Sequence, residues 1–290
     1  MKIAIAACAA QPDLSPSNTC YRDSLAAQGA DVSVLRWNNS PFDEFLAQDL
    51  IVLRQTWDYQ ADPGGFAAWL MRIAALGANV EPAPWLPIWN NDKRTLVEFE
   101  AAGVDTPQTV RLNRDRWRAA LAEFAGDQIV LKPAFGGDGV GVAVTSKAGF
   151  PDTLKQLDVT IPGRPLMTQE FLPEIADGEW KVTCIEGTVA LAIRATPREG
   201  EFRINGRFWP TIDVLEPPQA ARDAAERIMA FVGSPLCGRV DGVMRGDRFI
   251  CTEVELCDPD LHLHLAPHVA DQLASATLKR ARAGIAPATS

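Results

Sequence analysis

The segment from Cys251 to Pro259 constrains this chain most, because it places two carboxylates on one strand. Side chains alternate across a β-strand, so Cys251, Glu253 and Glu255 would share one face, and Thr252 and Val254 the other. Like charges held close together repel, so the strand is favourable only where water, cationic side chains or a metal ion neutralises the pair. The sequence therefore predicts that this strand lines a solvated or ion-binding site.

A second apolar run, Arg239 to Met244, is joined to this strand by the polar, glycine-containing segment Arg245 to Arg248, which is typical of a hairpin turn. A three- or five-residue loop would put Asp241 on the face of Glu253 and Glu255, and a two- or four-residue loop would put it on the opposite face. We expect an odd loop. Three carboxylates on a rigid sheet suit Mg²⁺, which prefers oxygen ligands and bridges to phosphates. A solvated polar face is the alternative.

Composition excludes several classes of protein. The 290 residues are 47% hydrophobic and carry a net charge of −9, which fits two or three α/β domains and lacks the basic surface of a sequence-independent nucleic-acid binder. The six cysteines form no CxxC pair, so we expect free thiols in the cytoplasm. The apolar start is interpreted as a buried strand rather than a signal peptide. No apolar stretch reaches the ~20 residues of a membrane span, so no membrane partner is expected.

Residues 1–90 alternate between apolar strands and helical patterns, which predicts parallel βαβ units with a ligand crevice at the carboxyl ends of the strands. The segment Trp57-Asp58-Tyr59 follows such a strand, Leu50–Leu53, and sits where a binding loop is expected. The alternative is that its aromatic rings pack against the next helix and do not contact a ligand. The Pro- and Trp-rich stretch 81–89 is interpreted as an inter-domain connection.

Residues 128–144 predict a strand, a glycine-rich loop and a second strand. The loop does not end in Gly-Lys-Ser/Thr and does not open a helix, so it is neither a Walker A loop nor a Rossmann loop. We expect a flap whose amides fold over phosphates, beside a fixed positive charge from Lys132. Lys93 lies in the first turn of a helix capped by Asn91 or Asp92, where a cation opposes the helix dipole and favours an anionic partner.

Taken together, these segments resemble the motifs of the ATP-grasp ligases, most of all the glutathione-synthetase and RimK-like branch. The matching segments are Asn91-Asp92-Lys93, Leu131-Lys132-Pro133 with the glycine loop, Gln169-Glu170-Phe171-Leu172, Gly178-Glu179, Phe202-Arg203-Ile204-Asn205, Asp241 and Glu253-Val254-Glu255. Their shared order makes the resemblance specific. It implies a mixed α/β and α+β fold, with an N-terminal βαβ domain (1–90), a central ATP-grasp lobe with the flap (91–171) and a C-terminal lobe with the metal carboxylates (172–290).

The resemblance implies a nucleotide held between the two lobes, with the purine at a hinge formed by residues 169–172. The implied ATP-binding residues are Lys93, Lys132, Gly136, Gly137, Asp138, Gly139, Val140, Gly141, Gln169, Glu170, Phe171, Leu172, Glu174, Asp177 and Glu179. Which of the last three holds the ribose is left open. Arg203 and Asn205 match an Arg-x-Asn element near the γ-phosphate, and with Lys132 they form the implied catalytic set.

The implied cofactors are ATP and two Mg²⁺ ions. Asp241 and Glu253 match the magnesium carboxylates of the family, and Glu255 stands where many members have Asn. The implied reaction is ATP-dependent joining of a carboxylate to an amine through an acyl phosphate, since phosphorylation gives a carboxylate a good leaving group. The Glu-Leu-Cys-Asp-Pro and Trp-Asp-Tyr segments resemble a subgroup that includes the D-cycloserine-forming ligase. That subgroup implies small carboxylate and amine substrates, a linear or cyclic amide product and a role in antibiotic biosynthesis.

For the substrate, we expect Trp57-Asp58-Tyr59 to face His262 and His264 across one pocket, with Asp58 holding an ammonium group. Arg194 is added to this substrate-binding set because it belongs to a basic segment that could clamp an anion. Two other functions stay open. One is a nucleotide-binding regulatory protein without turnover, and the other is a metal hydrolase built on His262, His264 and His268. Monomer and homodimer are both open.

Overall fold

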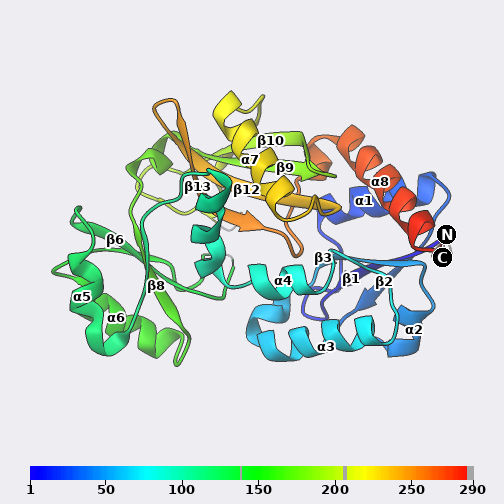
Figure 1. Cartoon of the computed structure of the whole chain (residues 1–290), viewed down its shortest axis with the longest axis horizontal. Helices are drawn as coiled ribbons and strands as arrows, with labels where there is room; N and C mark the ends of the chain where they lie inside the picture. The colour runs from blue at the N-terminus through cyan, green and yellow to red at the C-terminus, as the bar shows by residue number, and fades with distance from the viewer. Residues whose placement is uncertain (138, 205–207, 286–290) are drawn as a thin grey trace.

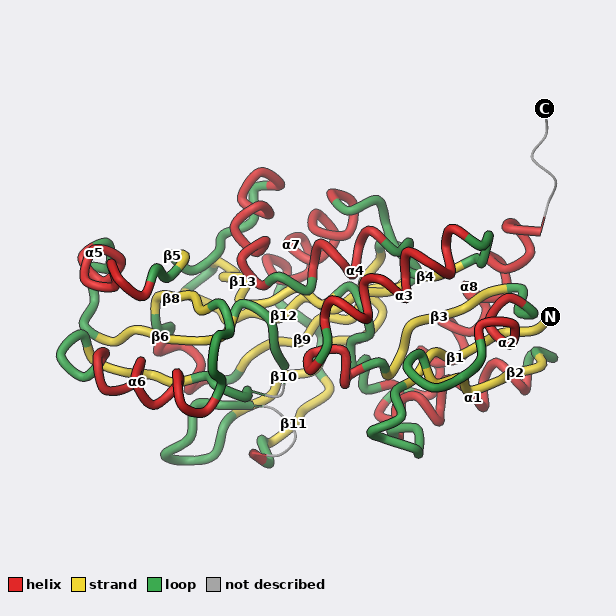
Figure 2. Tube along the Cα trace, turned by 90° about the horizontal axis from the view of Figure 1, so that it is seen from below, coloured by secondary structure: helices red, strands yellow, loops and turns green. Residues whose placement is uncertain are grey.

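The computed structural model describes residues 1–137, 139–204 and 208–285. The described strands form three separate sheets, which are numbered in chain order and lie within residues 2–81, 109–170 and 179–255. Figures 1 and 2 show the third sheet lying between the first and the second. Each sheet falls inside one of the three ranges expected from the sequence. The cavities described below open where the sheets meet.

The first sheet is parallel, and helices cover both of its faces. Its strands, in the order β2-β1-β3-β4, are β1 (Lys2–Ala7), β2 (Asp31–Arg36), β3 (Leu50–Gln55) and β4 (Val80–Glu81). All six residues of β3 are buried, as expected of a strand inside a covered parallel sheet. The covering helices are α1 (Pro16–Ala27) and α8 (Pro267–Ile285) on one face, and α2 (Phe42–Leu46) and α3 (Pro63–Ala75) on the other.

Local sequence sets the ends of these helices. The Ser15 hydroxyl accepts a hydrogen bond from the Asn18 amide at 3.2 Å and caps α1, whose first residue is Pro16. Gly29, with φ at +86°, follows the end of the same helix in a conformation that favours glycine. Helix α3 begins in the same way, with an Asp62 cap before Pro63.

Helix α8 returns the end of the chain to the first sheet (Figure 1). Leu273 and Ala274 are fully buried there against Ile3 and Leu25. The sequence analysis did not predict this helix, and the range 172–290 therefore contains an element that packs on the first sheet. Although α8 is the longest described helix, no helix in the described ranges combines the length and apolarity needed to cross a membrane.

The second sheet is antiparallel, with strand order β5-β8-β6-β7. Its elements are β5 (Thr109–Arg111), η3 (Arg114–Arg116), α5 (Trp117–Ala122), β6 (Gln128–Pro133), β7 (Ala143–Ser146), α6 (Phe150–Thr160) and β8 (Leu166–Glu170). Leu121 of α5 and Leu154 of α6 pack on Ile129 and Leu131 of β6. The alternate residue Lys132 therefore faces away from this core, toward the third sheet.

The third sheet has the order β11-β10-β9-β12-β13 and carries α7 on one face. Its elements are η4 (Pro173–Asp177), β9 (Glu179–Ile185), β10 (Thr188–Thr196), β11 (Thr211–Val214), α7 (Gln219–Phe231), β12 (Cys237–Arg245) and β13 (Arg248–Glu255). Ala225 and Ile228 of α7 are fully buried against Val182 and Val240. On the opposite face, Arg239 and Asp241 lie between Cys237, which belongs to the core that contains α8, and Val243, which packs with Leu172.

Four further short helices lie in the connections between the larger elements. They are η1 (Trp57–Ala61), α4 (Trp85–Asn90), η2 (Lys93–Ala102) and η6 (Leu263–Leu265). The η2 element is a 3₁₀ helix capped by Asp92 and ended by Gly103 at φ +71°, as the sequence predicts in position. The stretch 81–89, interpreted from the sequence as an inter-domain connection, leads from β4 of the first sheet toward the second sheet and contains the start of α4. All six cysteines are free, as expected, and five of them are buried.

The β12–β13 turn corrects one prediction. It has two residues, Gly246-Asp247, because Arg245 pairs with Arg248. The expected odd loop is therefore wrong. In an uninterrupted ladder from such a turn, Asp241 would pair with Thr252 and would lie on the face opposite the glutamates.

A β-bulge reverses this outcome. The register shifts so that Asp241 pairs with Glu253 while Gly242 pairs with Cys251, and Thr252 is the extra residue. Paired residues of an antiparallel ladder share a face, so Asp241 does lie on the face of Glu253. The bulge also reverses the faces that the sequence predicts for Thr252 and Cys251. Thr252 lines the cavities beside the glutamates, whereas Cys251 is fully buried in the core under α7.

Candidate active site

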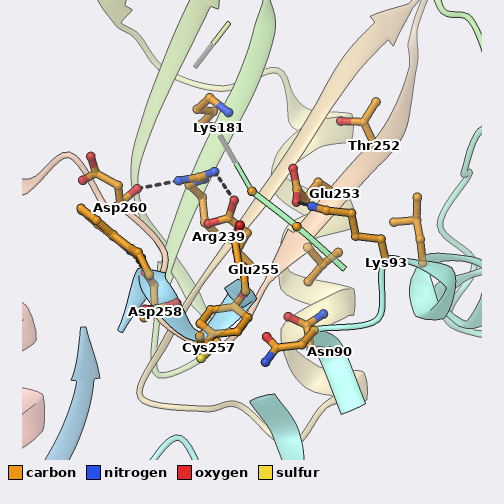
Figure 3. Close-up of a pocket in the computed structure, with 18 of the residues that line it drawn as sticks. Asn90, Lys93, Lys181, Arg239, Thr252, Glu253, Glu255, Cys257, Asp258 and Asp260 are labelled. Carbon is orange, nitrogen blue, oxygen red and sulfur yellow. Dashed lines mark hydrogen bonds and ion pairs between the residues drawn. The ribbon is translucent and has the colours of Figure 1, made fainter. Parts of the chain in front are cut away.

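Two adjoining cavities lie between the sheets. The larger cavity, about 410 Å³, lies between the first and third sheets, and Figure 3 shows it. The smaller cavity, about 190 Å³, lies between the second and third sheets. Both are lined by Lys93, Lys181, Arg239, Glu253 and Glu255. The carboxylate strand is therefore the wall that the two cavities share.

The predicted carboxylates do come together. Asp241, Glu253 and Glu255 each offer an oxygen, and these oxygens lie within 4.8 Å of one another. Asp241 is 1% exposed, whereas the two glutamates are partly open to the cavities. A cluster of three carboxylates on a sheet gives hard oxygen ligands suited to Mg²⁺.

Two cations hold Asp241 in place. Arg239 donates from Nε to Asp241 Oδ1 and from Nη2 to Oδ2, both at 2.8 Å, and Nη2 also lies 2.7 Å from Glu255 Oε1. Lys181 Nζ donates to Asp241 Oδ2 at 2.7 Å and to Glu179 Oε2 at 3.1 Å. Neither cation was predicted, although each stands two residues from a site carboxylate on the same strand. That spacing puts both on the same face.

The third cation is Lys93, whose ammonium forms an ion pair with Glu253. Lys93 is placed there by the first turn of η2, and its backbone amide donates to the Ala134 carbonyl at 2.8 Å. The short connection from α4 to η2 is also fixed to the carboxylate strand, because Asn90 Oδ1 accepts a hydrogen bond from the Leu256 amide at 2.8 Å.

Burial and neighbouring charges shift the pKa values of this cluster in opposite directions. Burial raises the pKa of Asp241, but Arg239 and Lys181 outweigh it and hold the carboxyl below its usual range. Burial raises the pKa of Glu255 to about 7, and Arg239 offsets this only in part. A divalent cation would favour the anionic form of Glu255, so the donor set fits the metal that the carboxylates suggest.

Lys132 lines the smaller cavity, and within the described ranges its hydrogen-bond partner is an amide rather than a carboxylate. Its Nζ donates to Gln169 Oε1 at 2.9 Å. Burial, followed by the nearby Lys93 ammonium, lowers the pKa of Lys132 to about 8. An ammonium whose hydrogen-bond partner is a neutral amide suits an incoming anion such as a phosphate.

The glycine-rich loop lies over both cavities. Gly136 and Gly137 line each of them, and Gly139 and Val140 line the smaller one. A Cβ atom on Gly137 would lie 2.2 Å from Gln60 Nε2, so the loop touches helix η1 of the first sheet. Gly141, at φ +73°, needs glycine for its backbone, and Asp138 lies outside the described residues.

The other residues predicted for nucleotide binding divide into two groups. Those that line the smaller cavity are Lys93, Lys132, Gln169, Glu170, Phe171, Leu172, Glu179 and Arg203. Glu174 does not line it and instead forms an ion pair with Arg245 at 2.5 Å, and Asp177 does not line it either. Asn205 lies outside the described residues. Of the three acidic candidates for the ribose, the cavity wall contains Glu179.

The substrate-side prediction is partly wrong. Trp57, Tyr59 and His262 line the larger cavity, but Asp58 and His264 do not. Asp58 instead accepts hydrogen bonds from Trp37 Nε1 at 2.6 Å and from Asn38 Nδ2 at 2.7 Å. The cause is the 3₁₀ helix η1, in which residues three apart share a side. Trp57 and Gln60 therefore face the cavity together, and Asp58 points elsewhere.

Two more predictions fail on geometry. Arg194 lines neither cavity, and its Nη2 lies 3.6 Å from Asp213 Oδ2 across the β10–β11 pair. His264 and His268 are exposed, on η6 and at the start of α8. Within the described ranges the group suited to a metal ion is the carboxylate cluster, so a histidine metal centre has no support.

The larger cavity also contains polar residues that the sequence analysis did not assign to the site. They are Gln11, Gln60, Asn90, Asp258 and Asp260. Asp258 and Asp260 follow the carboxylate strand directly, and that adjacency was the available signal. Gln11, Gln60 and Asn90 lie far from this strand in the sequence, and the tertiary fold brings them to the cavity.

Comparisons with known proteins place the chain in a family. Residues 3–82 match the model of the N-terminal domain of the D-cycloserine synthetase DcsG. Residues 94–231 match the model of the ATP-grasp domain of prokaryotic glutathione synthetase. The chain is 26% identical over 274 residues to the cycloserine biosynthesis protein DcsG of Streptomyces lavendulae, covering 87% of this chain and 89% of that protein.

A glutathione synthetase of Parasynechococcus marenigrum is 27% identical over 179 residues, which is 45% of this chain and 58% of that relative's length. Among solved structures, the crystal structure of D-cycloserine synthetase DcsG superposes with a TM-score of 0.81 at 21% identity, over 97% of this chain and 100% of that chain. The fold is therefore the ATP-grasp fold. The chain belongs to the ATP-grasp ligases, in the branch that includes glutathione synthetase and D-cycloserine synthetase.

Proposed function

We propose that this protein is an ATP-dependent carboxylate–amine ligase that acts on a small amino acid or analogue through an acyl phosphate. The observation that supports it best is the shared wall of the two cavities. Lys93, Glu253 and Glu255 line both, so a phosphoryl donor on one side and a carboxylate on the other would meet at the same residues.

ATP would occupy the smaller cavity. Lys132 and Lys93 supply positive charge for the phosphates, and the main chain of residues 169–172 supplies the purine hinge. Arg203 lines this cavity, where Glu201 orients it through hydrogen bonds of 2.9 and 2.7 Å. Its guanidinium would stabilise charge on the transferring phosphoryl group. Asn205 belongs to the same Arg-x-Asn sequence motif and is proposed to act in the same step.

The chemical steps need no nucleophilic side chain. An oxygen of the substrate carboxylate attacks the γ-phosphorus of ATP, and ADP leaves as the phosphorus–oxygen bond to it breaks. The amine nitrogen then attacks the acyl carbon of the mixed anhydride. Phosphate leaves with the original carboxylate oxygen, the nitrogen loses a proton, and an amide forms. An amine on another molecule gives a dipeptide or amide, and an amine within the same molecule gives a cyclic amide.

Magnesium has a natural place in this scheme. Asp241, Glu253 and Glu255 would hold it, and two ions are proposed. When bound, Mg²⁺ offsets negative charge on the phosphates and orients them. Arg239 and Lys181 already fix Asp241, so the cluster keeps its shape without relying on the ion alone.

The larger cavity sets the size of the substrate. Its volume of about 410 Å³ suits a small amino acid or analogue rather than a long peptide. A cyclisation like that of D-cycloserine synthetase is one form of the proposed reaction. The acidic chain and its free thiols support small-molecule partners and the cytoplasm as its compartment. A homodimer is also proposed, and a measurement of the protein's mass in solution tests it.

The direct test is a screen for ADP release. Purified protein with ATP and Mg²⁺ is offered each common amino acid in both configurations and a set of O-substituted serine analogues. We expect at least one compound to raise ADP release about tenfold or more over the rate without substrate. The matched control is Glu253→Gln, which keeps the shape but removes a charge from the proposed metal site and should abolish the increase.

The competing function is a regulatory protein that binds ATP without turnover. It predicts tight nucleotide binding and no compound-dependent ADP release in the same screen. The proposed ligase is wrong if that result holds for the whole set. The presence of Lys132, Arg203 and Glu253 at the cavity walls, with Asp241 paired to Glu253 behind them, favours turnover.

A further inference from the structure

Charge compensation differs sharply between the two ends of the larger cavity. At the end shared with the smaller cavity, Asp241, Glu253 and Glu255 each form an ion pair with Arg239, Lys181 or Lys93. At the other end lie Asp258 and Asp260, and Figure 3 shows them on the opposite side from Lys93 and Thr252. Among the described residues, neither has a lysine, arginine or histidine within ion-pair distance.

Asp258 is held in a fixed position without being neutralised. Its Oδ2 accepts hydrogen bonds from the Thr56 amide at 2.6 Å and from the Thr56 hydroxyl at 2.7 Å. Its carbonyl oxygen accepts from Trp57 Nε1 at 3.0 Å. The side chain is only 6% exposed, yet it lines the cavity. A buried carboxylate that meets only neutral donors is costly unless a cation approaches it.

The nearest cationic groups are committed elsewhere. Arg54 is fully buried and donates to the Pro259 carbonyl at 2.9 Å and to Asn18 Oδ1 at 3.2 Å. Arg239 donates to the Asp260 carbonyl rather than to its carboxylate, at 2.8 Å. His262 lies next to Asp260, but burial lowers the pKa of its imidazole to about 4, so it is neutral near pH 7.

We propose that Asp258 and Asp260 form a subsite for a protonated ammonium group of the substrate. The inference rests on the proposed ligase function and names the residues that select its substrate. It gives Asp258 the role that the sequence analysis expected of Asp58, whose carboxylate is occupied by Trp37 and Asn38. Trp57 and Tyr59 add aromatic surface to the same end of the cavity, which also favours a cation.

This assignment constrains the chemistry. An ammonium group beside these carboxylates keeps its proton, because a nearby negative charge raises its pKa. It therefore anchors the substrate and is not the attacking amine, which must be neutral. The nucleophile is a different nitrogen, on a second substrate or farther along the same molecule.

The test measures binding separately from turnover. Calorimetry is performed on the full-length protein saturated with AMP-PNP and Mg²⁺, with the common amino acids in both configurations as probes. The tightest-binding amino acid is then compared with its α-hydroxy acid. We expect the amino acid to bind the parent at least about tenfold tighter. Asp258→Asn and Asp260→Asn should each weaken amino-acid binding by roughly 10- to 100-fold and leave hydroxy-acid binding unchanged.

Two control variants separate charge from structure. Thr56→Val removes a hydrogen bond to Asp258 but keeps its charge, and should keep the preference for the amino acid. Asp58→Asn makes the same chemical change outside the cavity and should leave both affinities unchanged. Circular dichroism and AMP-PNP affinity report whether each variant folds. If Asp258→Asn does not fold, Asp260→Asn tests the subsite.

Three results would overturn the inference: no amino acid binds, the α-hydroxy acid binds as tightly as the amino acid, or the aspartate variants weaken both ligands equally. Failure of the ligase proposal looks different. In that case an amino acid binds with the expected preference but releases no ADP, and the ammonium subsite stands without the catalytic assignment.

Discussion

Two lysines that line the smaller cavity, Lys181 and Lys132, show how single residues differ in their tasks. Lys181 lies between Asp241 and Glu179, and although burial lowers its pKa, these carboxylates outweigh burial and raise it. Lys132 meets the Gln169 amide and the Lys93 ammonium instead, and its pKa falls to about 8. Lys181 is therefore a permanent counter-ion, whereas Lys132 gains a strong partner only when an anion enters the cavity.

This difference predicts a pH dependence of ATP affinity. Lys132 binds phosphate as its protonated form, so above pH 8 nucleotide binding requires proton uptake. The Kd for ATP should rise by up to about tenfold per pH unit above 8 and should not respond to this group below pH 7. Calorimetry in buffers of different ionisation enthalpy measures the proton uptake directly.

Lys132→Met should weaken ATP binding and remove the proton uptake. Lys279→Met is the matched control, since Lys279 is exposed and pairs with Glu186 on the surface, and it should keep the parent profile. A Lys132→Met variant with the parent's pH dependence would mean that another group takes up the proton.

At the scale of elements, the glycine flap and helix η1 form one contact between the nucleotide side and the substrate side. Gly137 of the flap has no side chain, and the Gln60 amide occupies the space where a Cβ would lie. Gln60 and Trp57 share the cavity side of η1. If ATP binds under this loop as proposed, closing of the loop and filling of the larger cavity would act on the same contact.

Substitution at this contact should affect the two sides unequally. Gly137→Ala places a Cβ against Gln60 and should raise KM for the amino acid by about tenfold while changing ATP affinity less. Gln60→Ala removes the obstructing amide, so the double variant should recover part of the loss. Steady-state kinetics on the four proteins of this cycle measure the coupling. Additive effects of the two substitutions would show that this contact does not couple the nucleotide side to the substrate side.

Elements also show where sequence reasoning succeeds and fails. Alternation placed Glu253 and Glu255 together correctly, because the period of a strand is local. The route by which Asp241 joins them was missed, since the bulge at Thr252 depends on how two strands pair. Helix α8 was missed although Pro267 stands at its first position, where proline is favourable.

Over the whole molecule, the order of motifs was sufficient to predict the ATP-grasp fold, and most of the residues expected to bind the nucleotide line one cavity. The substrate side was predicted less well. Trp57 and His262 do line one cavity, but Asp58 turns away and Asp258 takes its place. That cavity is assembled from the first and third sheets, so its wall depends on side-chain directions in short 3₁₀ segments and on contacts such as Asn90 to Leu256. Local periodicity does not specify these.

The central claim is that a substrate carboxylate is activated by phosphoryl transfer. The most direct measurement uses the amino acid found in the ADP-release screen, labelled with ¹⁸O in its carboxylate, and analyses the products by mass spectrometry. The account predicts ADP and inorganic phosphate that carries one ¹⁸O atom from the carboxylate for each amide formed. Formation of AMP and pyrophosphate, or of phosphate without the label, would contradict it.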